Sequence, residues 1–187
     1  MKYALVVIGA SLGGLRALRA VLSTLPAAFR LPLAVVQHRS PDAGDPLQVV
    51  LQESCALPVR EVEDKAPIAP GAVYLAEPNY HLLVDGDHFS LSTEDAVLNA
   101  RPSIDVLFES AGESFGERLI GVVLTGTGRD GALGLAAIQR RGGLALIEAP
   151  ASALAAEMPE AAVEATRGAV ELKLEAIGPY LVELGLK

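Results

Sequence analysis

The sequence opens with an apolar run that ends in a glycine-rich turn holding one serine. Gly9-Ala10-Ser11-Leu12-Gly13 spells G-x-S-x-G, the pattern of a nucleophile elbow, and an amphipathic stretch follows at once. In such an elbow a strand turns sharply into a helix, and small neighbours let the backbone double back beneath a serine held in a strained conformation. The serine oxygen then projects from the end of the sheet, with the positive helix N-terminus behind it. Ser11 is therefore the candidate nucleophile.

Two other polar residues, His38 and Asp130, stand at or just beyond the ends of predicted strands, 33–37 and 119–124. Because the carboxyl ends of parallel strands line one edge of a sheet, these residues and Ser11 can meet there. Together they have the chemistry of a catalytic triad. The serine attacks, the histidine accepts its proton, and the aspartate fixes the imidazole tautomer and stabilises the imidazolium.

Each of these residues also has an ordinary structural interpretation. Ser11 could belong to a plain turn after an α/β strand, and His38 to a loop or to the surroundings of a site. Asp130 stands just before a helical pattern, where an N-cap is common, and that role is compatible with catalysis. His81 and His88 lie in or beside a predicted hairpin and are interpreted as structural. The coincidence of three suitable residues at three strand ends favours catalysis.

A phosphate-binding loop is the main alternative for the turn at residues 9–14, because glycine-rich turns at helix N-termini also cradle phosphates. The spacing is not G-x-G-x-x-G, and the second predicted strand ends in Gln37-His38 rather than in an acidic residue that would bind a ribose. No P-loop pattern occurs in the sequence. The three histidines are far apart, so we expect no metal site and no cofactor.

The composition restricts the class of protein. The chain has 187 residues, of which 51% are hydrophobic and 20% charged, as is typical of one α/β domain. The single cysteine, Cys55, cannot form an internal disulfide, and the apolar run at 3–8 is too short for a membrane span. We therefore expect a cytoplasmic protein without membrane insertion. The net charge of −8, with scattered Lys and Arg, argues against nucleic acid or an anionic membrane as the main partner.

Strands and helices alternate along most of the chain. Apolar runs predict buried strands, and apolar residues three or four apart predict the helices between them. The predicted fold is α/β: a three-layer, doubly wound, mostly parallel sheet with right-handed crossovers. Strands are expected at 4–8, 33–37, 58–62, 72–76, 119–124, 144–147 and 169–172, and helices at 13–25, 46–54, 103–116, 132–141, 152–166 and 174–186.

An antiparallel hairpin is expected to interrupt this alternation. Residues 81–84 and 88–92 flank Asp85-Gly86-Asp87, which is a typical turn sequence. Residues 93–102 show no clear period, and Ser103 is the expected N-cap of the helix that follows.

Prolines and a serine set the expected helix boundaries elsewhere. Residues 40–46 are expected to form a loop whose Pro46 begins the next helix. Ser152 is expected to cap a short helix that is broken at Pro159, and Gly178-Pro179 is expected to interrupt the last helix.

Six motifs, taken in order along the chain, resemble those of a known family. They are Val7-Ile8-Gly9-Ala10-Ser11 with Gly13-Gly14; Val35-Val36-Gln37-His38; Pro70-Gly71 before Tyr74-Leu75-Ala76; Arg101-Pro102-Ser103-Ile104-Asp105-Val106-Leu107-Phe108; Leu124-Thr125-Gly126 with Gly128-Arg129-Asp130-Gly131-Ala132; and Met158-Pro159. In this order they are similar to the catalytic domain of the chemotaxis methylesterase CheB, over roughly residues 4–170. The resemblance implies a single CheB-type methylesterase catalytic domain over residues 1–187.

The resemblance also implies an activity. The family hydrolyses glutamate γ-methyl esters on chemoreceptors with release of methanol, and it deamidates certain receptor glutamines. Its Ser-His-Asp triad falls on Ser11, His38 and Asp130. Attack by the serine creates an oxyanion, for which the backbone N–H groups of Leu12 and Thr127 are the candidate donors. The implied partner is a methyl-accepting chemotaxis receptor or a related methylated signalling protein.

Several positions near the candidate site depart from the family pattern. Leu12 replaces the usual threonine, Thr127 the methionine of Gly-Met-Gly, Arg39 the methionine of Gln-His-Met, and Glu157 the glycine of Gly-Met-Pro. These changes leave the triad intact and alter the expected shape and charge of the cleft. Arg39 and Arg129 could steer an acidic receptor helix, or could be ordinary solvated arginines.

The full family enzyme has an N-terminal phospho-receiver domain that occludes its active site. This chain begins at its own first strand, so we expect either a stand-alone version or a trimmed part of a longer protein. A stand-alone version would not be regulated by its own receiver domain, and its substrate could differ from a conventional chemoreceptor. The alternative function is a non-catalytic α/β signalling module that binds a partner or a nucleotide.

Overall fold

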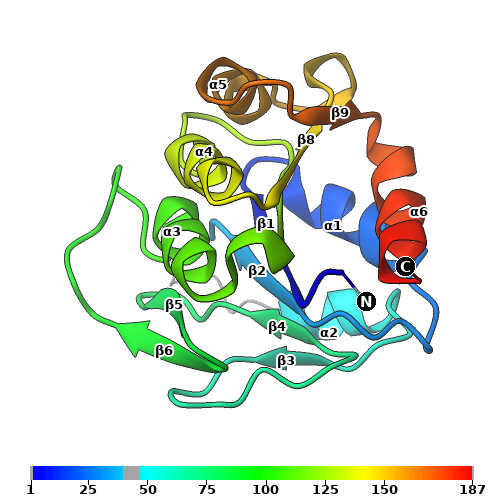
Figure 1. The fold of residues 1–187 in the computed structure, drawn as a ribbon, viewed down its shortest axis with the longest axis vertical. Helices are drawn as coiled ribbons and strands as arrows, with labels where there is room; N and C mark the ends of the chain where they lie inside the picture. Colours follow the sequence, from blue (N-terminus) through cyan, green and yellow to red (C-terminus); the bar gives the residue numbers. More distant parts are fainter. Residues whose placement is uncertain (1, 40–46, 187) are drawn as a thin grey trace.

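A computed structural model describes residues 2–39 and 47–186. A seven-stranded sheet runs through the centre in the order β3-β4-β2-β1-β7-β8-β9, and every neighbouring pair of strands is parallel (Figure 1). The strands are β1 Leu5–Ala10, β2 Leu33–Gln37, β3 Val59–Glu61, β4 Val73–Leu75, β7 Leu119–Val123, β8 Leu144–Glu148 and β9 Val170–Leu172.

Helices cover both faces of this sheet (Figure 1). One face packs against α1 Gly14–Leu22, α2 Leu47–Gln52 and α6 Leu174–Gly185. The other packs against α3 Ile104–Phe115, α4 Ala132–Arg140 and α5 Glu157–Ala165. The strands β5 His81–Asp85 and β6 His88–Ser92 form a separate antiparallel pair that packs on α3. The predicted three-layer α/β fold with an antiparallel hairpin is confirmed.

The apolar run of β1 is continuous because both faces of the strand are buried. Val6 and Ile8 join the core beneath α1 and α6, whereas Leu5 and Val7 join the core beneath α3 and α4. All six residues of the strand are buried. A strand covered on both sides has no solvent face, so alternation of polar and apolar residues disappears from its sequence.

The position of β1 in the sheet brings the three candidate residues to one edge. Its neighbours are β2 on one side and β7 on the other, so the chain winds outward in both directions from β1. The N–H of Ser11 donates to the Thr125 carbonyl at 3.0 Å, and the N–H of His38 donates to the Ala10 carbonyl at 3.0 Å. The carboxyl ends of these three strands therefore meet, as the sequence predicted.

The expected helix break at Pro159 is wrong. Pro159 lies in the first turn of α5, where a residue without an N–H forfeits no intrahelical hydrogen bond. Ser152 is not the N-cap of α5. It lies in a short 3-10 turn, Pro150–Ser152, where its hydroxyl donates to the Ala149 carbonyl at 2.9 Å.

The expected interruption at Gly178-Pro179 is also wrong, since α6 continues through both residues. Its buried face, which includes Leu174, Ile177 and Leu181, packs against the core and offsets the one hydrogen bond that Pro179 removes. The predicted loop at 40–46 and the helix start at Pro46 lie outside the described residues.

Membrane spans were also sought in the structure. Of residues 2–39 and 47–186, none belongs to a helix long and apolar enough to cross a bilayer.

A close approach of α3 and α4 yields a test of the fold. A Cβ added to Gly134 would lie 2.6 Å from the Cβ of Phe108 and 3.1 Å from the backbone of Asp105. We expect Gly134→Ala to lower the free energy of unfolding by about 1–3 kcal/mol, because the two helices must separate. Urea denaturation measures this change.

Gly112→Ala in α3 is the matched control. Its Cβ would make ordinary contacts, the nearest at 3.4 Å, and alanine favours a helix over glycine by about 1 kcal/mol. Stability should be unchanged or higher. Equal destabilisation by the two substitutions would contradict the conclusion that α3 and α4 approach each other too closely at Gly134 to admit a Cβ.

Candidate active site

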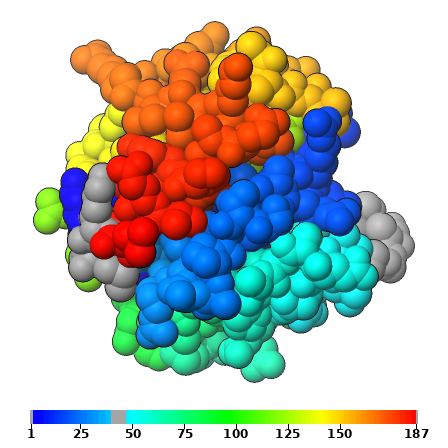
Figure 2. Space-filling view, turned by 90° about the vertical axis from the view of Figure 1, so that its right-hand side faces the viewer, coloured from blue at the N-terminus to red at the C-terminus, as the bar shows by residue number. Residues whose placement is uncertain are grey.

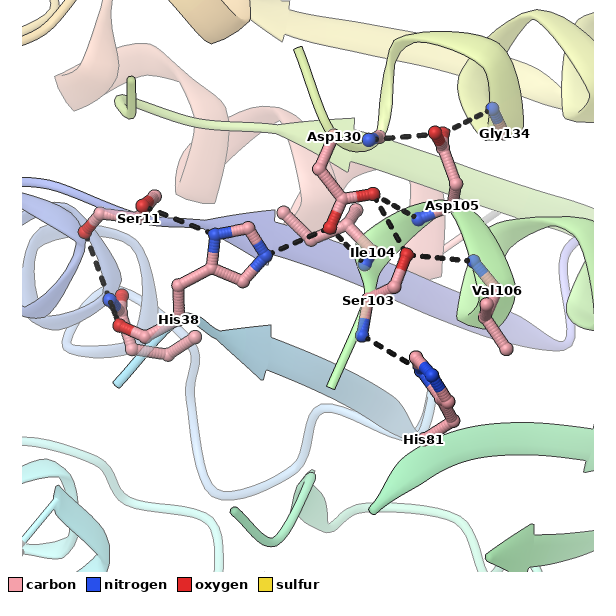
Figure 3. A network of polar contacts seen from close by, with 11 residues as sticks. Ser11, His38, His81, Ser103, Ile104, Asp105, Val106, Asp130 and Gly134 are labelled. Atoms are coloured by element: carbon pink, nitrogen blue, oxygen red, sulfur yellow. Dashed lines mark hydrogen bonds and ion pairs between the residues drawn. The ribbon is translucent and has the colours of Figure 1, made fainter. Parts of the chain in front are cut away.

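The three residues predicted to form a triad lie in one chain of contacts (Figure 3). The Oγ of Ser11 is 3.2 Å from Nδ1 of His38, and Nε2 of His38 is 2.8 Å from Oδ2 of Asp130. A carboxylate only accepts hydrogen bonds, so Nε2 carries the proton and Nδ1 is the free basic nitrogen that faces the serine. The geometry thus has a nucleophile, a base and an orienting anion in sequence.

The turn after β1 is held by the side chain of Gln37. Its Nε2 donates to the carbonyl of Ser11 at 2.9 Å and to that of His38 at 2.8 Å. Gly14 must be small here, because a Cβ would lie 1.9 Å from Oε1 of Gln37. The left-handed residue of the turn is Gly13, with φ 82°, and Ser11 is absent from the residues with positive φ. The expected strained serine is therefore wrong: the glycine adopts the special conformation.

Asp130 is buried at the N-terminus of α3. Its Oδ2 accepts the N–H of Ile104 at 2.7 Å, and its Oδ1 accepts the hydroxyl of Ser103 and the N–H of Asp105, both at 2.9 Å. Burial alone would raise the pKa of Asp130. The hydrogen bonds from His38 and from these amides lower the pKa by more than burial raises it, so the net pKa is depressed. Asp130 remains an anion that can hold His38 and stabilise its protonated form.

The start of α4 is held by a carboxylate of α3, just as the start of α3 is held by Asp130 from the turn before α4. Asp105, in the first turn of α3, accepts the N–H groups of Gly131 at 3.0 Å and Gly134 at 2.7 Å, which begin α4. The residue at the cap of α4 is Gly131, without a capping side chain. The expectation that Asp130 caps the helix after it is therefore wrong, because Asp130 binds the start of α3 instead.

Asp105 has an unusual pKa because it shares this buried space with a second anion. Burial is the largest effect and raises its pKa, the Gly134 amide lowers it, and the negative charge of Asp130 raises it. Together these effects raise the pKa of Asp105 from 3.8 to about 6. The side chain is thus an acid that titrates in the mildly acidic range directly behind the candidate triad.

Ser103, Asp105 and His81 are residues of the site that sequence reasoning missed. The expected N-cap role of Ser103 is confirmed, since its Oγ accepts the N–H of Val106, yet nothing in the sequence linked that hydroxyl to Asp130. His81 is buried: its Nδ1 accepts the N–H of Ser103 at 3.2 Å, and its Nε2 donates to the Asp95 carbonyl at 3.0 Å. His81 therefore supports the start of α3 as well as the hairpin.

The two candidate oxyanion donors are the amide of Leu12, which follows Ser11 in the chain, and the amide of Thr127, which lines the same hollow as Ser11. Within residues 2–39 and 47–186, neither amide N–H donates to a protein acceptor. The next amide, that of Gly128, is occupied by the carboxylate of Glu157 at 2.8 Å. Glu157, one of the departures from the family pattern, therefore anchors the loop that carries Thr127.

Thr125 connects the segments that carry these two donors. Its hydroxyl lies 3.0 Å from the Leu12 carbonyl and accepts the N–H of Ala155 at 2.8 Å. Its own N–H donates to the buried carboxylate of Glu148 at 2.8 Å. The spacing between the nucleophile turn and the loop at 126–128 is thereby fixed by bonds from strand ends.

Two hollows meet at Ser11 and His38. The first, of about 820 Å³, is walled by residues 95–102 and by residues 127–130, and it is polar. The second, of about 780 Å³, runs along the start of α1. Arg39 is not a solvated steering charge, because its guanidinium donates to the Ala76 carbonyl at 3.0 Å and to Glu61 at 3.2 Å, with only 6% of its side chain exposed. Arg129 is exposed at the rim of the first hollow.

Metal-binding groups were also sought. In the part of the chain that the structure describes, no three His, Cys, Asp or Glu side chains gather as they would around a metal ion.

The arrangement matches known proteins over nearly the whole chain. The family model described as CheB methylesterase matches residues 6–181. The chain belongs to the CheB methylesterase family. A crystal structure of the Thermotoga maritima CheB methylesterase catalytic domain superimposes with a TM-score of 0.92 at 32% identity, covering 97% of this chain and 98% of that one.

Two relatives of the CheB family extend this comparison. A Leptospira interrogans protein, provisionally named protein-glutamate methylesterase/protein-glutamine glutaminase, is 44% identical over 98% of this chain and 96% of its own length. The protein-glutamate methylesterase FrzG of Myxococcus xanthus is 44% identical over 97% of this chain and 54% of its own length.

The raised pKa of Asp105 predicts a pH-dependent stability difference. Since the folded state holds the Asp105 proton more tightly than the unfolded state, the stability that Asp105 contributes is lost as pH rises from about 3.8 through about 6. The variant Asp105→Asn cannot lose a proton, and its amide oxygen can still accept the two glycine amides. Its stability relative to wild type should rise by roughly 2–3 kcal/mol between pH 4 and pH 7.

Chemical denaturation at pH 4, 5, 6 and 7 measures this difference. Glu109→Gln, which alters an acidic residue of α3 that only adds to the shift of Asp105, should reproduce a small part of the effect. Parallel stability curves for wild type and Asp105→Asn would contradict the raised pKa.

Proposed function

We propose that this protein is a serine esterase that hydrolyses γ-methyl esters of glutamate residues on a methylated signalling protein and releases methanol. The observation that carries the proposal is the contact chain from Ser11 Oγ through Nδ1 and Nε2 of His38 to Asp130. Relatives named as protein-glutamate methylesterases supply the substrate class. The 187 residues then act as one catalytic domain.

Acylation begins with the nucleophile. Oγ of Ser11 attacks the ester carbonyl carbon while Nδ1 of His38 takes the hydroxyl proton. The resulting oxyanion accepts hydrogen bonds from the amides of Leu12 and Thr127, which have no protein acceptor in the described residues. The tetrahedral intermediate collapses, its C–O bond to the methoxy group breaks, and His38 returns the proton so that methanol leaves. The glutamyl group stays on Ser11.

Deacylation reverses the roles. His38 takes a proton from water, the hydroxide attacks the acyl carbon, and collapse of the second intermediate returns the proton to Ser11 and frees glutamate. Asp130 remains ionised because the hydrogen bonds from His38 and from the α3 amides hold its pKa low. Each step uses groups of this chain and water alone, so no cofactor or metal is required.

The same steps act on an amide, with ammonia leaving in place of methanol. Since the Leptospira relative is named as a glutaminase as well as a methylesterase, we include deamidation of protein glutamine as a second activity. The substrate is then a methyl-accepting chemotaxis receptor or a related methylated signalling protein, and the activity takes place in the cytoplasm.

Methanol release from methylated receptor membranes tests the proposal. Wild type should release methanol, and Ser11→Ala should lower the rate by about 10⁴–10⁶-fold, because a triad acts as a unit. Ser23→Ala is the matched control, since Ser23 is exposed at the far end of α1 and its hydroxyl donates to the nearby Ala20 carbonyl. This control should retain full activity.

A fluorophosphonate probe separates the remaining outcomes. Labelling of Ser11 without methanol release would mean that the esterase takes another ester. No labelling of the wild type would contradict the esterase mechanism and favour the alternative, a non-catalytic module that binds a partner or nucleotide.

A further inference from the structure

The first two turns around α1 present a row of exposed side chains beside the nucleophile. Leu15, Arg16 and Arg19 lie in the first turns of the helix, with Leu15 and Arg19 one turn apart, and Leu12 lies in the turn before it; all four line one hollow. The opposite side packs into the core through Ala17, Leu18, Val21 and Leu22. We refer to Leu12, Leu15, Arg16 and Arg19 as the α1 face. In Figure 2, α1 is part of the blue strip between α6 in red and α2 in cyan.

The α1 face is unusually apolar at the end nearest Ser11. Leu12 is 57% exposed and Leu15 is 41% exposed. Both line the second hollow, of about 780 Å³, which also contains Ser11 and His38. A segment of another protein lying along this face would therefore bring its side chains directly to the reactive pair.

The far end of the α1 face is positively charged, although the whole chain has a net charge of −8. Helix α1 contains no acidic residue, and no carboxylate of the described residues lies within 4 Å of the guanidinium of Arg16 or Arg19. Arg16 acts only at longer range on the buried Glu148. Two exposed arginines that form no close ion pair within the described residues of an acidic protein indicate a partner with negative charge.

We propose that the α1 face docks an acidic amphipathic helix of the substrate protein, the segment that flanks the glutamyl ester. The inference rests on the proposed esterase function and names the part of the substrate that this chain recognises. With the ester at Ser11, apolar residues one turn away contact Leu12 and Leu15, and carboxylates two turns away pair with Arg16 and Arg19. Leu15 and Arg19 lie one turn apart along α1, about 6 Å, which matches a one-turn separation between apolar and acidic residues on a partner helix.

Charge reversal on the α1 face tests the docking. The double variant Arg16→Glu/Arg19→Glu should lower kcat/KM for methanol release from methylated receptors by about 10–100-fold at low salt. Added salt should shrink the loss, since it screens exposed charges. The rate of fluorophosphonate labelling at Ser11 should stay at the wild-type value, because that probe is too small to reach the arginines.

Two further variants sharpen the result. Leu15→Gln should lower kcat/KM on the methylated receptor by a smaller factor that does not depend on salt, again with unchanged labelling. Arg30→Glu is the matched control: Arg30 is exposed in the loop before β2, at the opposite edge of the sheet, and its reversal should leave both readouts unchanged.

The outcomes that contradict the docking differ from those that contradict the esterase. Wild-type methanol release with no loss in the double variant would overturn the docking alone, as would equal losses of methanol release and labelling. Conversion of a dimer to monomers by the double variant, measured by sedimentation, would mean that a second copy covers the face and would also overturn it. Absence of wild-type methanol release would overturn both proposals.

Discussion

The carboxylate of Asp130 is the group on which the rest of the site depends. Four donors converge on its two oxygens: the imidazole of His38, the hydroxyl of Ser103, and the amides of Ile104 and Asp105. A buried carboxylate would ordinarily lose its charge, but the helix N-terminus and the histidine keep the anion stable. A stable anion in turn fixes which imidazole nitrogen carries the proton, and so which one faces Ser11.

Other hydrogen bonds hold the segments around this carboxylate in place relative to Ser11 and His38. Asp105 accepts two amides at the start of α4, so the start of α3 is held by a carboxylate from the turn before α4, and the start of α4 is held by a carboxylate from α3. On the opposite side, Gln37 ties the carbonyls of Ser11 and His38 together. Because β1 lies between β2 and β7, the contacts of Gln37 and of His38 with Asp130 connect segments that follow three adjacent strands. A shift of one strand would therefore disturb nucleophile, base and anion at the same time.

Sequence reasoning located the three strand-end residues because buried parallel strands and the turns after them have strong patterns. It gave the layers of the fold and the N-cap at Ser103 for the same reason. It could not show that Asp130 binds α3 rather than the helix after it, since that choice depends on how α3 and α4 pack. His81 and Asp105 were missed because their roles arise from contacts between distant segments. The helix breaks predicted at Pro159 and Pro179 were wrong for different reasons. Pro159 lies in the first turn of α5, where its missing N–H costs no hydrogen bond, and α6 continues through Pro179 because its buried face packs against the core.

The tautomer of His38 is the most direct test of this account. Nitrogen-15 NMR of the wild type at neutral pH, with His38 assigned by comparison with His38→Gln, reports which ring nitrogen carries the proton. In its neutral form the imidazole is expected to carry its proton on Nε2, with Nδ1 free toward Ser11, and to lose that preference in Asp130→Ala. A neutral His38 protonated at Nδ1 in the wild type, or the same tautomer in wild type and in Asp130→Ala, would contradict the role assigned to the buried carboxylate.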